Sequence, residues 1–304
     1  MAVVAVVIPH YNQPEYLEEC LRSVHNQSFQ DWQTIVVDDA STFGDPETII
    51  SRVADKRIQL IRHESNRGLG AARNTGFRAT AAPLVLPVDS DDCLHPDFLQ
   101  TTVEVLLKQP AFDCVYTEFQ LFGSSNQIWR FDVRSPEEML QTQWIPGPGT
   151  LMRKRFWADI GGYSEVMALT GNDDWEFWIR AIRHGVRPYK ISRPLYLYRR
   201  HADSMSLTAL QDRDYRTREI IYQLHREFFD KYGAGAQFRA EGYLNSSLAS
   251  MKRGKRWRAI RLAFRGVLLE PGSRYLKRQL ARSLAPEALV RMKRRFRAQR
   301  SVQL

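Results

Sequence analysis

Short apolar runs alternate with stretches of helical periodicity through the first part of the chain. Each apolar run has the length of a buried strand, and each intervening stretch carries apolar residues at helical spacing. The predicted elements are strands at 3–8, 33–37, 58–61 and 84–88 and helices at 14–24, 46–54 and 69–81. Strands and helices that alternate at this pitch indicate right-handed β-α-β units. We therefore predict an α/β fold with a mostly parallel sheet.

The later part of the chain is less regular. Its predicted elements are a helix near 96–108, strands at 113–116, around 117–133, at 151–152 and at 194–198, and a helix at 154–160. Gly161 and Gly162 end that last helix. Long periodic stretches after residue 206 are typical of helices. A chain of 304 residues can hold a large α/β domain and an appendage. We place a domain at 1–205 and a helical, basic extension at 206–304.

Three carboxylates, Asp89, Asp91 and Asp92, follow the apolar run at 83–88. Acids at the end of a buried strand lie where open α/β sheets bind their ligands. Because carboxylates packed this closely repel one another, a bound cation is a natural way to keep them ionised. Oxygen ligands favour a hard cation, Mg²⁺ or Mn²⁺. The alternative is that these acids cap the following helix, and Asp92 is a candidate for that role.

A second acidic pair, Asp38 and Asp39, ends the predicted strand at 33–37. Parallel strands of one sheet end at a shared edge, so both acid clusters are expected to face one ligand site. The alternative is that residues 38–42 are simply a turn, in which Asp and Ser are favoured.

The segment 66–76 contains Gly68 and Gly70, which match the start of a dinucleotide-binding fingerprint. Arg73 stands where that fingerprint has its third glycine, and the turn after the first strand has no glycine. These absences argue against a dinucleotide-binding domain, and the chain has no Walker A sequence. We interpret the segment as a loop entering a helix. Arg73 then either meets an anionic group near the helix start or lies on the surface.

Asp173 and Asp174 open a predicted helix whose apolar face includes Trp175 and Trp178. Helix capping is one role for this pair. A carboxylate beside aromatic rings and other acids has a raised pKa, which suits a general base. Farther on, His201 follows the predicted strand at 194–198. A lone histidine is usually structural, but one beside a carboxylate-bound cation can complete its coordination shell.

Composition limits the class of protein. Hydrophobic and charged contents of 43% and 26% are those of a globular protein. No apolar stretch reaches the about 18 residues of a membrane span, and Pro9 breaks the N-terminal apolar run, which we interpret as a strand rather than a signal peptide. Three scattered cysteines favour a reducing compartment. We expect a cytoplasmic protein, with peripheral attachment to the inner face of the membrane as an option.

Basic residues are concentrated near the C-terminus. Residues 251–304 carry 17 Lys and Arg side chains and two acids, whereas the net charge of the whole chain is +10, so residues 1–250 are net acidic. One face of a predicted helix carries Trp257, Ile260, Phe264, Val267 and Leu268. Its basic residues, Lys255, Arg256, Arg258, Arg261 and Arg265, lie largely elsewhere. Such a helix either binds an anionic membrane surface or packs on the α/β domain with a solvated basic rim.

The motifs, taken in order, resemble those of the family 2 glycosyltransferases. The matching segments are 7–12, 37–42, 66–76, 89–91 (the DXD motif), 161–165, 173–174 and 198–201. The resemblance covers residues 3–204 and does not extend to the rest of the chain. One departure is that the family often has Glu then Asp at its base motif, where this chain has Asp173 and Asp174. The resemblance implies a GT-A fold, which is a Rossmann-like mixed sheet flanked by helices.

The resemblance also implies a role for each matched residue. Donor binding falls to Pro9, Tyr11, Asn12, Asp38, Asp39, Arg73, Asp89 and Ser90. Asp91, Asp89 and His201 would hold Mg²⁺ or Mn²⁺. Asp174, with Asp173 beside it, would take the proton of the acceptor hydroxyl.

The implied reaction is an inverting transfer of a sugar from a nucleoside diphosphate sugar, UDP rather than GDP, to a glycan or lipid-linked glycan. Synthesis of a cell-surface polysaccharide or lipopolysaccharide would use such a reaction. Two other classes stay open at this point. A nucleic-acid-binding protein would grip phosphates with its basic end, but this leaves the acidic clusters unexplained, so we expect no nucleic-acid partner. A sugar-nucleotide-binding domain without catalysis leaves Asp174 unexplained.

Overall fold

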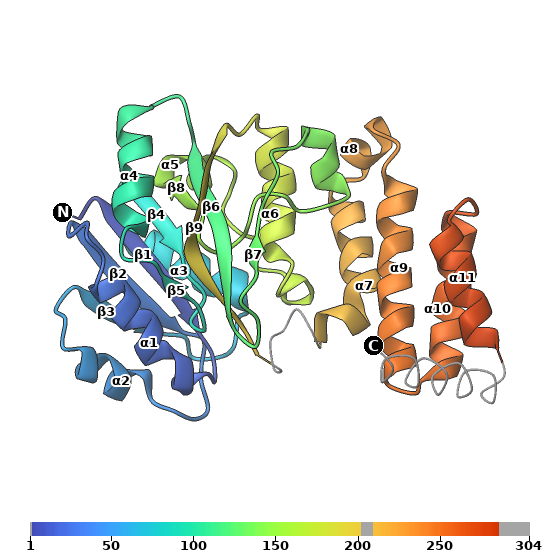
Figure 1. The fold of residues 1–304 in the computed structure, drawn as a ribbon, viewed down its shortest axis with the longest axis horizontal. Coiled ribbons are helices and arrows are strands. Elements are labelled where there is room, and N and C mark those ends of the chain that lie inside the picture. The colour runs from blue at the N-terminus through green and yellow to red at the C-terminus, as the bar shows by residue number, and fades with distance from the viewer. Residues whose placement is uncertain (1, 202–208, 286–304) are drawn as a thin grey trace, which may run out of the picture. The chain divides into compact units, whose positions relative to one another are not determined.

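The computed structural model describes residues 2–201 and 209–285, and the chain divides into two compact units, residues 1–202 and 203–304 (Figure 1). The boundary predicted at residue 205 falls outside the described residues. The first unit contains the sheet, and the second is built from helices.

The first unit is built on one mixed sheet, with nine strands among the described residues. The strands are β1 Val4–His10, β2 Trp32–Asp38, β3 Ile58–Arg62, β4 Leu84–Pro87, β5 Cys93–Leu94, β6 Cys114–Gly123, β7 Ile128–Trp129, β8 Leu151–Arg153 and β9 Pro188–Arg200. Their order is β3-β2-β1-β4-β8-β6-β9-β5, with β7 paired to β6. The first four strands of this order are parallel, as the alternation of strands and helices predicts. Beyond β4 the sheet is mixed, because β8 runs antiparallel to both β4 and β6.

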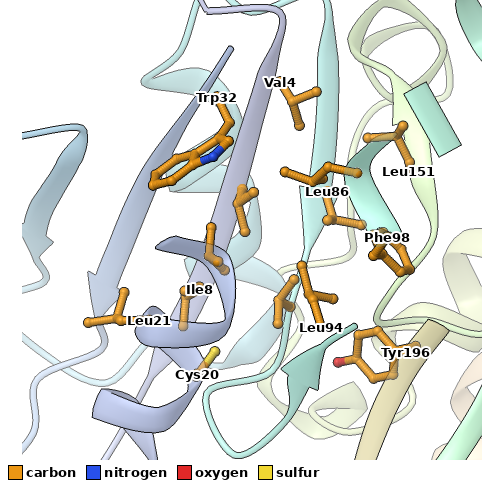
Figure 2. Close-up of a cluster of buried hydrophobic side chains, with 14 of the residues drawn as sticks. Val4, Ile8, Cys20, Leu21, Trp32, Leu86, Leu94, Phe98, Leu151 and Tyr196 are labelled. Carbon is orange, nitrogen blue, oxygen red and sulfur yellow. The ribbon is translucent and has the colours of Figure 1, made fainter. Parts of the chain in front are cut away.

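Helices cover both faces of this sheet. They are α1 Pro14–His25, α2 Pro46–Val53, α3 Leu69–Arg78, α4 Phe98–Lys108, α5 Lys154–Asp159 and α6 Asp173–Arg183, with short 3₁₀ turns at Pro136–Leu140 and Met167–Leu169. Alternate residues of β1, such as Val4 and Ile8, enter a core cluster with side chains of α1 and α4, including Leu21 and Phe98 (Figure 2). Val7 points the other way and touches α3. Burial on both faces explains why β1 is an unbroken apolar run.

Two elements differ from the prediction. The short strand β5 follows the acidic cluster directly, so α4 begins at Phe98 rather than at residue 96. β9 runs from Pro188 to Arg200 and is longer than the predicted 194–198. Its first half includes Lys190 and Arg193, and polar side chains at partly exposed positions conceal the apolar pattern of a strand.

The second unit contains five helices among the described residues. These are α7 Ala209–Leu224, α8 Arg226–Lys231, α9 Gly235–Lys252, α10 Arg256–Leu269 and α11 Arg274–Leu284. α9 packs against α7 and α10, and α11 packs against α10 (Figure 1). Within the described residues, no helix combines the length and the apolar content that crossing a membrane requires.

Gly76 sets how closely α3 approaches the sheet. A Cβ at this position would collide with the side chain of Val7 on β1, which is fully buried. We predict that Gly76→Ala lowers the free energy of unfolding by about 1–3 kcal/mol, as overpacking of a core does, despite the better helix propensity of alanine. Urea unfolding measures the change.

The matched control is Gly272→Ala, because a Cβ there meets no atom within 4 Å. It should change the free energy of unfolding by less than about 0.5 kcal/mol. A Gly76→Ala protein as stable as the wild type would contradict the close packing of α3 on β1.

Candidate active site

The carboxyl ends of β1, β2 and β4 meet at one edge of the sheet. Pro9 is buried in β1 and pairs with Val37 of β2, while Val7 pairs with Pro87 of β4. Beyond these pairs the backbone N–H of Asp39 donates to the carbonyl of His10. The segments that follow the three strands therefore start side by side. Both acid clusters lie at the same edge, as the sequence predicts.

Asn12 joins the turns that follow β1 and β2. Its backbone N–H donates to Ser41 Oγ (3.0 Å), and its Oδ1 accepts from the N–H of Thr42 (2.8 Å). Asn12 has a φ of +52°, in the left-handed region that asparagine tolerates better than most residues. Asp38 is buried and accepts from the N–H of Ser41 (3.0 Å), so it does have the turn role considered for it. The turn leaves Tyr11 44% exposed, with its ring open to a ligand.

Asp39 ties β2 to the loop that enters α3. It is buried, and one carboxylate oxygen lies 2.7 Å from His63 Nδ1. The same oxygen accepts from the backbone N–H of Arg67, and the other accepts from that of Gly68, both at 2.8 Å. A carboxylate offers about four acceptor positions. Asp39 therefore fixes this loop and keeps capacity for a further donor.

Arg73 lies between the two carboxylate motifs. Its guanidinium donates to Asp89 Oδ1 (2.8 Å) through one nitrogen and to Asp173 Oδ2 (2.9 Å) through the other. Arg73 and Asp173 are each 1% exposed. Of the two alternatives for Arg73, the surface position is wrong, and the anionic groups that it contacts are carboxylates of the chain itself. The arginine brings the DXD motif and the acidic pair of α6 into one charge network.

Asp173 and Asp174 differ in exposure although they are adjacent. Burial and the charge of Asp174 raise the pKa of Asp173 to about 6, and the nearby Arg73 limits this rise. Asp174 is only partly buried. Burial also raises the pKa of Asp174, while Arg73 and Gln143 act against the rise. Of the two residues, Asp174 is the less buried one.

Gln143 and Gly147 shape the surroundings of Asp174. Gln143 Nε2 donates to Asp174 Oδ2 (2.9 Å), and Asp174 Oδ1 accepts from the backbone N–H of Trp175 (2.8 Å). A Cβ at Gly147 would collide with the carboxylate of Asp174. The segment before β8 thus holds this carboxylate in one position.

Asp91 and His201 come together although they are 110 residues apart in the chain. His201 Nε2 lies 3.0 Å from Asp91 Oδ2, and both side chains stay partly exposed. Burial and the charge of Asp89 raise the pKa of Asp91, while the contact with His201 acts against the rise. Ser90, which stands between Asp89 and Asp91 in the sequence, is buried, and its Oγ donates to Gln13 Oε1 (3.2 Å). Among the described residues, no three His, Cys, Asp or Glu side chains form a group that could hold a metal ion.

Asp92 does not cap a helix, so that prediction is wrong. Its buried carboxylate accepts from Tyr196 Oη (2.7 Å) and from the backbone N–H of Arg199 (2.8 Å). The N-cap position of α4 belongs to Asp97 instead. Because β5 separates the motif from α4, Asp92 is directed toward β9 and anchors this strand under the DXD motif.

Three residues of the site were not found from the sequence. Gln143 positions Asp174, Tyr196 binds Asp92, and the Nε of Arg199 donates to the carbonyl of Asp91 (2.7 Å). Arg199 also lies over the ring of Tyr16, 4.9 Å from its centre. Tyr196 and Arg199 stand five and two residues before His201, the predicted metal ligand, and this was a usable signal. Gln143 stands in a polar stretch without a pattern and gave none.

The family model for Glycosyl transferase family 2 matches residues 5–171, more than half of the chain. The chain belongs to glycosyltransferase family 2. TuaG of Bacillus subtilis (strain 168), a glycosyltransferase assigned to teichuronic acid biosynthesis, is 27% identical over 210 residues, which are 67% of this chain and 81% of TuaG. The enzyme is therefore a glycosyltransferase, as the sequence predicts.

Solved structures share the fold. Residues 1–349 of S. aureus TarS in complex with UDP-GlcNAc align with a TM-score of 0.64 and 19% identity over 88% of this chain and 81% of that one. The mannosyltransferase PcManGT from Pyrobaculum calidifontis, in complex with GDP-Man and Mn²⁺, aligns with a TM-score of 0.60 and 18% identity over 93% of this chain and 84% of that one. The predicted GT-A fold of this family 2 glycosyltransferase is confirmed.

Arg73 offers a test of the charge network. We predict that Arg73→Met lowers the free energy of unfolding by about 3–5 kcal/mol at pH 8, because it leaves Asp173 as an unpaired buried charge. Without Arg73 the pKa of Asp173 rises further above the ordinary value of about 3.9. An acid with a raised folded-state pKa stabilises the fold below its unfolded pKa and loses this contribution as pH rises through the folded pKa. The difference in free energy of unfolding between the wild type and Arg73→Met should therefore be smaller at pH 5 than at pH 8. Urea unfolding at both pH values measures it.

Arg78→Met is the matched control on the same helix. Arg78 is exposed and pairs with Glu165 at 3.0 Å, so its loss should change the free energy of unfolding by about 0–1 kcal/mol at either pH. Equal small losses in both variants would contradict the bridging role of Arg73.

Proposed function

We propose that this family 2 glycosyltransferase transfers a sugar from a nucleoside diphosphate sugar to an acceptor hydroxyl with inversion at the anomeric carbon. The observation that carries the proposal is the link from Asp89 through Arg73 to Asp173, the residue next to the less buried Asp174. A leaving-group site and a base would thus be held in one rigid network. Positioning of this kind is a main source of rate enhancement in bimolecular transfers.

The donor binds at the edge formed by the ends of β1, β2 and β4. The exposed ring of Tyr11 stacks on the base, the turn 9–12 lies along the nucleoside, and the remaining acceptor capacity of Asp39 takes a ring N–H. We propose uridine as the base, which the UDP-GlcNAc complex of the similar TarS supports. Asp38 and Asn12 keep the two turns in place rather than contacting the sugar.

Asp91 and His201 suit a hard divalent cation. Asp91 Oδ2 and His201 Nε2 lie 3.0 Å apart at a partly exposed position. These two side chains are not a complete metal site, so water and the diphosphate oxygens of the donor would supply further ligands to a cation bound there. We propose that Asp91 and His201 bind Mg²⁺ or Mn²⁺, with Asp89 as a ligand directly or through water, and the Mn²⁺ complex of PcManGT supports this. When bound, such a cation neutralises the charge that grows on the departing diphosphate. Ser90 and Arg199 hold the backbone of the motif around it.

Asp174 is the proposed base. The acceptor oxygen attacks the anomeric carbon, the bond from that carbon to the diphosphate oxygen breaks, and the acceptor proton passes to Asp174. The raised pKa of Asp174 makes it a better proton acceptor than an ordinary aspartate. Asp173 is buried and paired, so we assign it the role of positioning Arg73. The acceptor is proposed to be a glycan or lipid-linked glycan of a cell-surface polysaccharide, which similarity to TuaG supports.

Asp174→Asn separates catalysis from donor binding. The amide keeps the shape of the side chain and cannot take a proton, so we expect transfer to fall by about 10²–10⁴-fold. Donor affinity should stay within about twofold, since Asp174 lies outside the proposed donor contacts. Initial rates and calorimetric titration with UDP-sugar measure the two effects. Asp97→Asn, at a half-exposed residue away from this edge, is the control and should retain both. Parallel loss of rate and affinity would reveal a structural role for Asp174.

Asp91→Ala tests the cation and, with it, the donor. A screen of UDP- and GDP-sugars with Mn²⁺ should raise the melting temperature of the wild type for the correct donor, because a ligand at 100 times its Kd stabilises by about 2.7 kcal/mol. We expect EDTA or Asp91→Ala to remove this shift, while Asp97→Ala keeps it. A donor-induced shift and turnover that both survive EDTA would refute the cation proposal and leave the base assignment standing.

A further inference from the structure

The helix α10 buries a side made mostly of small residues and exposes three large apolar ones. Its buried side consists of Ala259, Leu262, Ala263 and Gly266. A Cβ at Gly266 would meet Leu276 of α11, so this side is small because the neighbouring helix is close. The opposite side carries Trp257, Phe264 and Leu268, which are 83%, 52% and 64% exposed.

These three side chains lie along one face of α10, with Arg261 between Trp257 and Phe264, and we call the three the strip. They are spaced by seven and then four residues, and this spacing returns to the same face of an α-helix. Packing within the second unit does not account for the strip, since the unit buries the other side of α10. Exposing three large apolar groups in a row is unfavourable in water, so such a strip marks an interaction surface.

Exposed basic side chains surround the strip. Two arginines of α10 are used internally: Arg256 donates to the carbonyl of Ser283 (2.9 Å), and Arg258 pairs with Asp212 (2.7 Å). The remaining basic residues of α10 and α11 are exposed and make no ion pair with a described residue; they are Arg261, Arg265, Arg274, Lys277, Arg278 and Arg282. Across residues 252–285 the one acid is Glu270.

We propose that the exposed face of α10, with the basic side chains of α10 and α11, binds the surface of an anionic lipid bilayer. Trp, Phe and Leu on one face with Arg and Lys beside them is the pattern of helices that lie in the membrane interface. Tryptophan in particular favours the level of the headgroups. The basic residues supply attraction to anionic lipids, which falls off within a Debye length of the surface. This surface is independent of the glycosyl transfer proposed above.

The positive charge around the strip favours an anionic bilayer over other binding partners. A second copy of the chain would bring two strongly basic surfaces together. The segment 286–304 carries six Lys and Arg residues and one acid, Glu287, so it would also meet like charge. RNA would match the charge but not the aliphatic Leu268, which offers no ring for stacking on a base.

Sedimentation of the full chain with vesicles tests the proposal. The wild type should bind vesicles of phosphatidylcholine with phosphatidylglycerol more tightly than vesicles of phosphatidylcholine alone, and high salt should weaken this binding. Phe264→Ser with Leu268→Ser should weaken binding by about tenfold or more. Leu107→Ser with Leu224→Ser is the control, because these residues are equally exposed, at 61% and 52%, but lie on α4 and α7. The control variant should bind as the wild type does.

The double variant Arg261→Gln with Arg265→Gln is a second test of membrane binding, and it changes no buried side chain. It should weaken binding to the phosphatidylglycerol vesicles and leave the melting temperature unchanged. The proposal is overturned if the wild type ignores anionic vesicles or if both double variants bind like the wild type. It is equally overturned if poly(U) binds and vesicles do not, or if sedimentation velocity shows a dimer that Phe264→Ser with Leu268→Ser dissociates.

Discussion

The pairing of the buried Arg73 with Asp173, which is buried, and Asp89, which is partly exposed, is the interaction on which the site depends. Two carboxylates from distant parts of the chain, 16 and 100 residues away, meet one guanidinium. Arg73 and Asp173 are buried, and either one without its partner would be an uncompensated buried charge. These three charged groups therefore add little net stability, but few arrangements of the chain allow all of them to be paired. Their pairing fixes α3, the DXD motif and the start of α6 relative to one another. Because Asp174 follows Asp173 at the start of α6, its position is fixed as well.

The sheet makes this meeting geometrically simple. The parallel strands β2, β1 and β4 end at one edge of the sheet. Acids that directly follow these strands in sequence therefore lie close together in space. α3 reaches the same edge because Gly76 lets it lie directly on β1, and Gly70 lets it pass close to the carbonyl of Ser164. Close approach of backbones, allowed by two glycines, thus determines where the guanidinium of Arg73 can stand.

These features divide what the sequence can predict from what it cannot. Strand ends and their acids are local patterns, so Asp38, Asp89 and Asp91 could be placed at one edge from spacing alone. The partner of a polar side chain is set by packing far away in sequence, and here the predictions fail. Asp92 looks like a helix cap until β5 and β9 pair and bring Tyr196 to it. Gln143 has no pattern around it, and its contact with Asp174 arises only when the segment before β8 folds against α6.

The same separation explains the second unit. Periodicity identifies α10 as amphipathic, yet it cannot say which of its two faces the protein buries. The larger side chains would be the expected core, because burial of Trp, Phe and Leu yields the most free energy. Close packing against α11 at Gly266 instead requires a small residue there, and Leu262 is buried while Trp257, Phe264 and Leu268 are left outside. Because these side chains are not buried within their own unit, they can contact a binding partner. The basic residues around them favour a partner with an anionic surface.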